Sequence, residues 1–175
     1  RLSAEAPGVP ISIDTSKAAV MRAAVHAGAS FVNDVAALQG PGALEAVAEL
    51  GVPVCLMHMR GEPRTMQDHP VYDDVVTEVA RFLSERVAAC RAIGIPDDRI
   101  VVDPGFGFGK TTAHNLELLR RLDVLTHLGR PVMVGLSRKR TIGEITGRGV
   151  AERLVGSVVA AVLAVQRGAS IVRVH

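Results

Sequence analysis

The chain alternates short apolar runs rich in β-branched residues with longer segments of helical periodicity. We expect the six short runs to be strands, at residues 9–14, 30–34, 53–59, 100–103, 131–136 and 170–174. Helices are expected between and around them at 17–27, 42–50, 72–93, 113–128, 139–147 and 151–166. This alternation is typical of βαβ units and predicts a parallel sheet with helices on its faces.

Polar side chains follow every predicted strand at its C-terminal end. They are Asp14, Asn33 with Asp34, His58 with Arg60, Asp103, Ser137 to Lys139, and Arg173 with His175. A closed barrel brings these strand ends to one face, which carries the active site, whereas an open doubly wound sheet spreads them along a crevice. Polar groups after all six strands favour the barrel. We therefore predict an α/β fold with about six units of a parallel (β/α)8 TIM barrel, in a single domain covering residues 1–175.

Composition excludes several classes of function. The 175 residues carry a net charge of +2 with one Tyr, four Phe and no Trp, which argues against nucleic acid as a partner. The most apolar stretch, 154–165, is shorter than the roughly 20 residues that a membrane span needs, so no membrane association is expected. Cys55 and Cys90 form no Cys-x-x-Cys pair, which favours reduced thiols and a cytoplasmic location.

The glycine-rich segment 103–111, Asp-Pro-Gly-Phe-Gly-Phe-Gly-Lys-Thr, invites two phosphate-binding interpretations and fits neither. A P-loop would need glycine at Pro104, and a dinucleotide-binding turn would need glycine at Lys110. The alternative to a functional segment is a flexible turn that only connects two elements. A functional role is favoured because Asp103 directly follows an apolar strand, and because the glycines allow backbone to approach a ligand.

Other polar residues have two interpretations. Asp14 could cap a helix or bind a ligand. The side chains of Asn33 and Asp34 should point to opposite faces, so only one should enter a site. His58 is more simply structural, and no His-Glu-x-x-His or clustered His/Cys pattern predicts a transition-metal site built by the protein.

The cations Arg138, Lys139 and Arg140 stand at the start of a predicted helix, where the helix dipole disfavours positive charge. Anionic ligand groups would compensate for this placement. Arg173 and His175 add cationic groups after the last strand. Carboxylates on some strand ends and cations on others fit a ligand with a hydrogen-bond-donating heterocycle and an anionic tail.

The motif Asp-Pro-Gly-Phe-Gly-Phe-Gly-Lys, with Ser-Arg-Lys and Arg-Val-His further on, closely resembles the dihydropteroate synthase family of folate-pathway enzymes, the targets of sulfonamides. Ile-Ser-Ile-Asp-Thr-Ser-Lys, Val-Asn-Asp-Val and Leu-Met-His-Met resemble it too. The resemblance runs over the whole chain, from the third barrel strand to the eighth. We therefore expect a piece of a longer protein that lacks the family's first two strands and last helix, and that is inactive by itself.

This resemblance implies condensation of 6-hydroxymethyl-7,8-dihydropterin diphosphate with p-aminobenzoate to give 7,8-dihydropteroate and diphosphate. It implies Mg²⁺ as cofactor, with no protein ligand for it in this chain, and a homodimer. It also implies catalytic roles for Lys139, Arg173 and His175, and the following binding sets. Pterin would contact Asp14, Asn33, Met57, Asp103, Lys139 and Arg173; p-aminobenzoate would contact Phe108 and Ser137; diphosphate would contact Arg173 and His175.

Two alternatives stay open at the level of sequence. Methyltetrahydrofolate-binding methyltransferase barrels, which act with corrinoid partners, resemble this chain in their pterin-contacting Asp and Asn residues. They have no need of the cationic set formed by 137–139, Arg173 and His175. The second alternative is a noncatalytic pterin-binding remnant, or one lobe of a fused folate protein.

Overall fold

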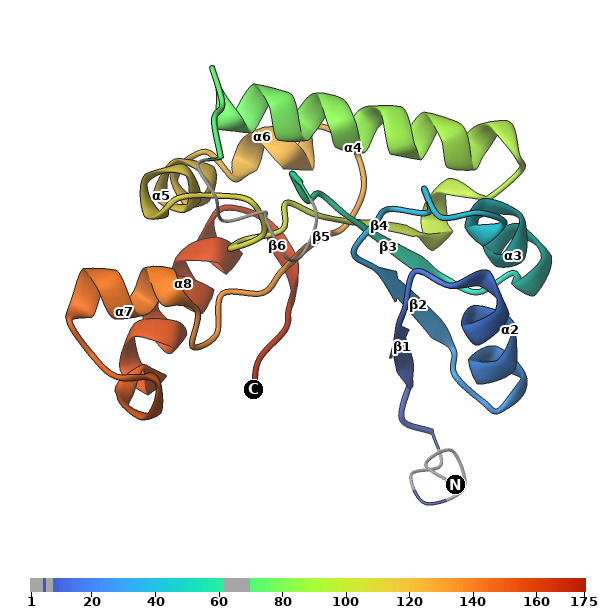
Figure 1. Cartoon of the computed structure of the whole chain (residues 1–175), viewed down its shortest axis with the longest axis horizontal. Coiled ribbons are helices and arrows are strands. Elements are labelled where there is room, and N and C mark those ends of the chain that lie inside the picture. Colours follow the sequence, from blue (N-terminus) through green and yellow to red (C-terminus); the bar gives the residue numbers. More distant parts are fainter. Residues whose placement is uncertain (1–4, 6–7, 62–69) are drawn as a thin grey trace.

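The computed structural model describes residue 5, residues 8–61 and residues 70–175. Its centre is one parallel six-stranded sheet in which the strands stand in sequence order. Figure 1 shows that the sheet is curled. Its strands are β1 (Ser12–Asp14), β2 (Phe31–Asp34), β3 (Val54–Met57), β4 (Ile100–Asp103), β5 (Val132–Val134) and β6 (Ala169–Val172).

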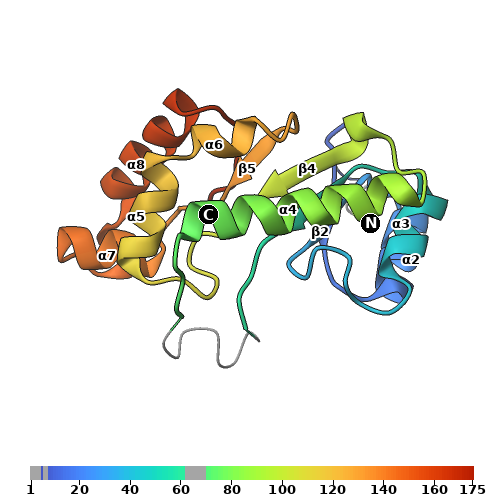
Figure 2. The same ribbon diagram turned by 90° about the horizontal axis from the view of Figure 1, so that it is seen from above.

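Helices connect successive strands and lie outside the curl (Figures 1 and 2). In Figure 1, α2 and α3 lie beside the first strands, α4 crosses the top, and α5 to α8 gather on the other side. They are α2 (Ala18–His26), α3 (Ala43–Leu50), α4 (Val75–Ala92), α5 (Thr112–Arg120), α6 (Asp123–Thr126), α7 (Arg140–Thr146) and α8 (Leu154–Gln166), with short 3₁₀ turns at η1 (Asp97–Arg99) and η2 (Val150–Glu152). Six consecutive parallel strands with outer helices confirm the predicted partial barrel.

The two faces of the sheet build two layers of core. Residues such as Leu56 and Val102 pack with the helices in the main core cluster. Their neighbours Cys55, Val101 and Met133 form a separate small cluster, which the alternation of side chains places on the concave face. Met57 and Asp103 share the parity of Cys55 and Val101, and they are register partners on β3 and β4. Both are thereby directed to the concave face, at the C-terminal ends of their strands.

The prediction of one helix over 113–128 was wrong. The structure has two, α5 and α6, because the chain leaves helical geometry at Arg121. The carbonyl of Arg120, at the end of α5, accepts a hydrogen bond from Nε of Arg167 at 3.2 Å. A side chain 47 residues further along thus satisfies a helix-end carbonyl.

The observed strands are shorter than predicted. Pro53 and Pro131 were placed inside strands, but each precedes one. Proline has no N–H to donate to a ladder, although the carbonyls of Pro53 and Pro131 still accept from Val32 and Val102, both at 3.0 Å.

None of the helices in the described ranges is long and apolar enough to cross a membrane. The predicted free thiols are confirmed, since Cys55 and Cys90 are both buried and unpaired with each other. Burial raises the pKa of the Cys90 thiol to about 11, and it raises the pKa of Cys55 well above its usual value. Both are therefore core thiols in their protonated form.

Candidate functional site

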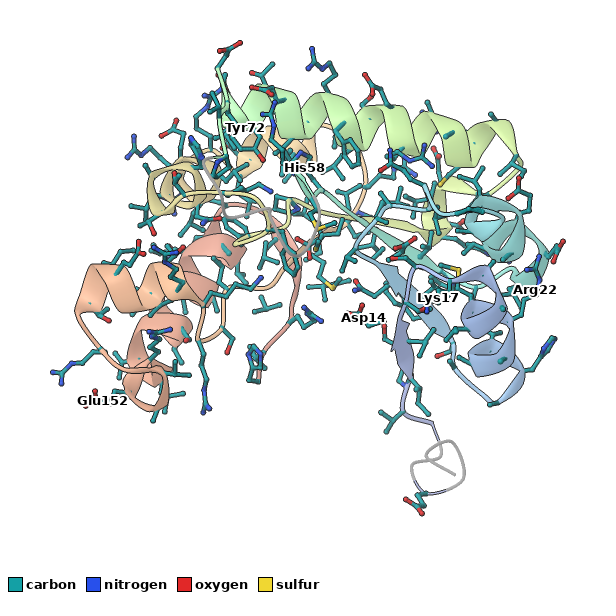
Figure 3. The ribbon with its side chains drawn as sticks, in the orientation of Figure 1. Asp14, Lys17, Arg22, His58, Tyr72 and Glu152 are labelled. Carbon is teal, nitrogen blue, oxygen red and sulfur yellow. The ribbon has the colours of Figure 1, made fainter. Side chains whose placement is uncertain are left out.

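Asp14 joins the two outer strands of the curled sheet. Its Oδ2 accepts a hydrogen bond from Nδ2 of Asn33 at 3.0 Å and another from Nη1 of Arg173 at 3.3 Å. Arg173 follows β6, so the polar ends of β1, β2 and β6 meet here. Figure 3 labels Asp14 at the end of β1. The alternative role of Asp14 as a helix cap is not seen, because Lys17 occupies the position before α2 and no side chain of the described residues caps that helix.

Asn33 leaves a buried acceptor without a partner. The residue is only 5% exposed, and its Oδ1 makes no hydrogen bond with any described residue. An unsatisfied buried carbonyl oxygen costs about 1–3 kcal/mol, so a ligand donor at this position would be stabilising.

The neighbouring Asp34 has a different task. Its carboxylate accepts from the backbone N–H groups of Ala36 at 2.8 Å and Leu38 at 2.9 Å, and from the hydroxyl of Ser16. It therefore shapes the loop after β2. Only Asn33 of the pair is directed to the strand-end site, as the alternation predicts.

Asp103 is a buried carboxylate at the end of β4. Its Oδ1 accepts from the Gly105 N–H at 2.7 Å, and the residue is 6% exposed. Burial raises the pKa of Asp103, whereas the Gly105 N–H and then the charges of Lys139, Lys110 and Arg173 lower it. Cations from three other segments therefore interact with this carboxylate, as expected if all of them contribute to one site.

Lys139 faces the glycine-rich loop. Its Nζ donates to the carbonyl of Phe106 and lies 4.4 Å from the centre of the Phe108 ring. Burial lowers the pKa of Lys139 to about 8, against the opposing attraction of Asp103. A cavity of about 340 Å³ is lined by Phe108, Lys139, Thr111, Asn115 and Glu144, among others.

The remaining predicted residues lie around this centre. Met57 is buried and pairs with Asp103 in the strand register. Ser137 is buried and accepts the backbone N–H of His175 at 3.3 Å, while the side chain of His175 is exposed. Ser137 does not line the 340 Å³ cavity.

The sequence patterns assign no role to Lys110 and indicate only that this residue does not complete a dinucleotide-binding motif. In the structure Lys110 is 3% exposed, and its Nζ contacts Nδ1 of His58 at 2.9 Å. Only the close spacing of lysine and glycines hinted at a special environment. Arg60, predicted with His58, is at the surface, where it pairs with Glu78 and covers the Tyr72 ring. Figure 3 labels His58 and Tyr72 near each other.

Comparison with known proteins agrees with this geometry. The model of the pterin binding enzyme family matches residues 1–175. The chain belongs to this family. The dihydropteroate synthase of Escherichia coli strain K12 is 52% identical over 165 residues, which are 94% of this chain and 58% of that protein.

Two solved structures of dihydropteroate synthase from Xanthomonas albilineans are also similar. The structure with 4-aminobenzoic acid has a TM-score of 0.94 and 57% identity, and covers all of this chain and 62% of its own. The structure in complex with 7,8-dihydropteroate has a TM-score of 0.93 and 56% identity, and covers all of this chain and 64% of its own. The chain thus spans about three fifths of the length of these relatives.

Proposed function

We propose that the complete protein carrying this chain is a dihydropteroate synthase. The observation that carries the proposal is Asn33 Oδ1, a buried strand-end acceptor that receives no hydrogen bond from the described residues, together with the buried carboxylate of Asp103 at the end of β4. The planar N–C–N edge of a pterin donates in parallel to a carboxylate, as a guanidinium does. Hydrogen bonds to charged groups contribute about 1.5–3 kcal/mol each.

The cations support the same assignment. Lys139, whose charge acts on Asp103, can donate to the acceptor edge of a pterin, and Met57 can pack against the ring. Arg173 is half exposed, so its guanidinium can bind a diphosphate while it contacts Asp14. A methyl-transfer site would have no use for cations that receive a leaving diphosphate.

The reaction we propose is substitution at the methylene carbon of the pterin. The C–O bond breaks and its electron pair leaves with the diphosphate, which Arg173 and His175 receive. Positive charge on the carbon spreads into the dihydropterin ring. The amine of p-aminobenzoate then forms the C–N bond and loses a proton to water. Stabilising the leaving group and positioning the amine suffice, so no protein nucleophile is required.

The p-aminobenzoate subsite is proposed at Phe108 and Ser137. The Phe108 ring offers an apolar face beside Lys139, and the Ser137 hydroxyl can donate to the carboxylate. The related structures with 4-aminobenzoic acid and with 7,8-dihydropteroate support small molecules of this kind.

The residues described build no site of their own for the magnesium that the family resemblance implies, which would be held mainly by the diphosphate of the substrate. Mg²⁺ prefers several oxygen ligands in octahedral geometry. Within residues 8–61 and 70–175, no three His, Cys, Asp or Glu side chains are grouped to hold an ion. Asp14, the exposed carboxylate of the site, is already paired with Asn33 and Arg173.

We also propose a cytoplasmic homodimer. Free, buried cysteines support a reducing compartment. Helix α8 exposes an apolar surface, formed by Leu154, Val155, Val158, Val159, Val162 and Val165. A groove of about 790 Å³ runs between α5, α7 and α8 beside it. Apolar patches of this kind mark surfaces that a partner covers.

The test of the function uses the complete protein. We expect diphosphate release from the pterin diphosphate to depend on p-aminobenzoate. Asp103→Asn should weaken pterin binding about tenfold or more by calorimetry, because one charged hydrogen bond is lost. Asp98→Asn, at an exposed carboxylate, is the matched control. Methyl transfer to a corrinoid in place of diphosphate release, or unchanged pterin affinity in Asp103→Asn, would contradict the proposal.

A further inference from the structure

Lys110 uses all its hydrogens inside the protein. Its Nζ lies 2.9 Å from His58 Nδ1, 3.0 Å from the carbonyl of Gly105 and 3.0 Å from the carbonyl of Phe108. An ammonium has three N–H groups, which matches three acceptors within 3.0 Å. Lys110 therefore has no donor left for a ligand, although it lines the 340 Å³ cavity.

His58 is built as an acceptor for this lysine. Its ring packs edge-on against Phe82 with centroids 5.0 Å apart, and its backbone N–H donates to the carbonyl of Asp103 at 2.9 Å. When Lys110 is charged it can only donate, so Nδ1 is then the acceptor and the ring proton is on Nε2. Burial, then the charge of Lys110, lowers the pKa of His58 to about 3, so the ring stays neutral. Burial lowers the pKa of Lys110 to about 7, opposed by Asp103.

The contacts of Lys110 fall on the loop at 104–109, which carries the chemistry of the site. Gly105 donates its N–H to Asp103, and Phe108 lies under Lys139. Gly105 and Gly109 have positive φ, and a Cβ would stand 1.9 Å from the His58 carbonyl at Gly105 and 2.2 Å from the Arg60 carbonyl at Gly109. Glycine at these points permits the close approach but leaves the loop without side-chain anchors there.

We propose that Lys110 is a positioning residue, which with His58 fixes the loop at 104–109 so that Phe108 stands at the p-aminobenzoate subsite. The kinetic consequence rests on the proposed function, but the structural one does not. Phe108 lies within the loop and contacts Lys139, whereas Asp103 is part of β4. Loss of Lys110 should therefore affect p-aminobenzoate more than pterin.

The first experiment measures the loop itself. Lys110→Met keeps the length of the side chain and removes its donors. Backbone hydrogen exchange in the complete protein should become at least tenfold faster in peptides covering 104–109, where the Gly105 and Phe108 amides are hydrogen-bonded, and unchanged in α4. Arg91→Met, at an exposed cation that pairs with Asp97, is the control. Unchanged exchange at 104–109 would overturn the proposal whatever the enzyme's activity.

The second experiment measures kinetics. In Lys110→Met we expect the KM for p-aminobenzoate to rise about tenfold or more, with the KM for the pterin diphosphate changed less than threefold. An equal rise in both, or a fall in kcat with neither KM changed, would overturn the positioning role. A wild-type protein without p-aminobenzoate-dependent diphosphate release would contradict the proposed function, and the exchange experiment would then decide the role of Lys110.

A third comparison applies even if Lys110→Met fails to fold. In His58→Asn the amide Oδ1 replaces Nδ1 as acceptor, whereas His58→Leu removes the acceptor. We expect wild-type exchange at 104–109 and a wild-type KM for p-aminobenzoate in His58→Asn, with both altered in His58→Leu. Identical behaviour of the two variants would overturn the proposal.

Discussion

Neighbouring residues at a strand end can serve structure and function separately. Asp34 uses both carboxylate oxygens on loop amides and Ser16, while one oxygen of Asn33 has no donor among the described residues. The alternation of side chains predicts this division, because consecutive side chains leave a strand on opposite faces. The partners of each side chain come from other segments, so the sequence alone could not assign the task of each.

His58 links the site to the pH dependence of stability. Its folded pKa is about 3, below the ordinary value of 6.5. Between these values the unfolded chain binds a proton that the folded chain does not, so the free energy of unfolding falls as pH falls from 6.5 toward 3. This group contributes a slope of up to about 1.4 kcal/mol per pH unit. His58→Asn should flatten the slope in urea unfolding of the complete protein between pH 6.5 and 4.

The slope, and not the absolute stability, is the informative quantity for His58, because the substitution also removes the packing against Phe82. His127→Asn, at an exposed histidine, should leave the slope unchanged. Parallel pH curves for His58→Asn and the wild type would show that His58 is not the group responsible.

The burial of Lys110 could not be predicted from the sequence, unlike the functional role of Asp103. Asp103 could be predicted as functional because a carboxylate directly after an apolar strand is exceptional. Burial of Lys110 depends on contact with His58, which lies 52 residues away along the chain. The glycines beside Lys110 hint at an unusual environment, but the local pattern does not show that the lysine is buried.

At the scale of elements, α8 supports the turn that carries Lys139. Arg138 has a positive φ of 54°, a conformation that costs energy for a residue with a side chain. Its N–H donates to Oγ of Ser157 at 2.9 Å, and its carbonyl accepts from Nη1 of Arg153 at 3.1 Å. The Arg153 guanidinium also fills the space beside Gly143, where a Cβ would lie 2.2 Å from Nη2. The strained turn is therefore held from two positions on the following segment.

Ser157→Ala should lower the free energy of unfolding by about 1–3 kcal/mol, because it leaves the Arg138 N–H without its acceptor. Urea denaturation of the complete protein measures this change. Ser84→Ala, at an exposed position in α4, should have little effect or stabilise slightly, since alanine has the higher helix propensity. Equal effects of the two substitutions would show that Ser157 does not support the turn.

Element boundaries divide into those with local signals and those without. The strand at 100–103 was predicted with its observed ends, because it is apolar up to Asp103. The break between α5 and α6 was missed, since neither glycine nor proline marks it. Contacts of Arg120 and Arg121 with Arg167 and Asp74 accompany the break, and these are tertiary interactions.

At the scale of the whole molecule, the exposed surface of α8 predicts self-association. Sedimentation equilibrium of the complete protein should give twice the mass of one chain. Val159→Glu, which places a charge in the groove between α7 and α8, should shift the equilibrium to the monomer. Val20→Glu, at an exposed position on α2, should leave the dimer intact. A monomeric wild type, or an intact dimer in Val159→Glu, would contradict the homodimer.

The contact between Asp14 and Arg173 joins residues 159 positions apart. During synthesis, the first strands leave the ribosome long before the segment that brings the guanidinium to them. Until then, Asn33 is the one partner that the described residues of this site offer the carboxylate. The two sides of the ligand pocket therefore become available at different times during synthesis. The acceptor side at Asp14 and Asn33 can form on the nascent chain, whereas Arg173 on the cationic side is synthesised last. A ligand that needs both sides cannot assist the earliest stages of folding.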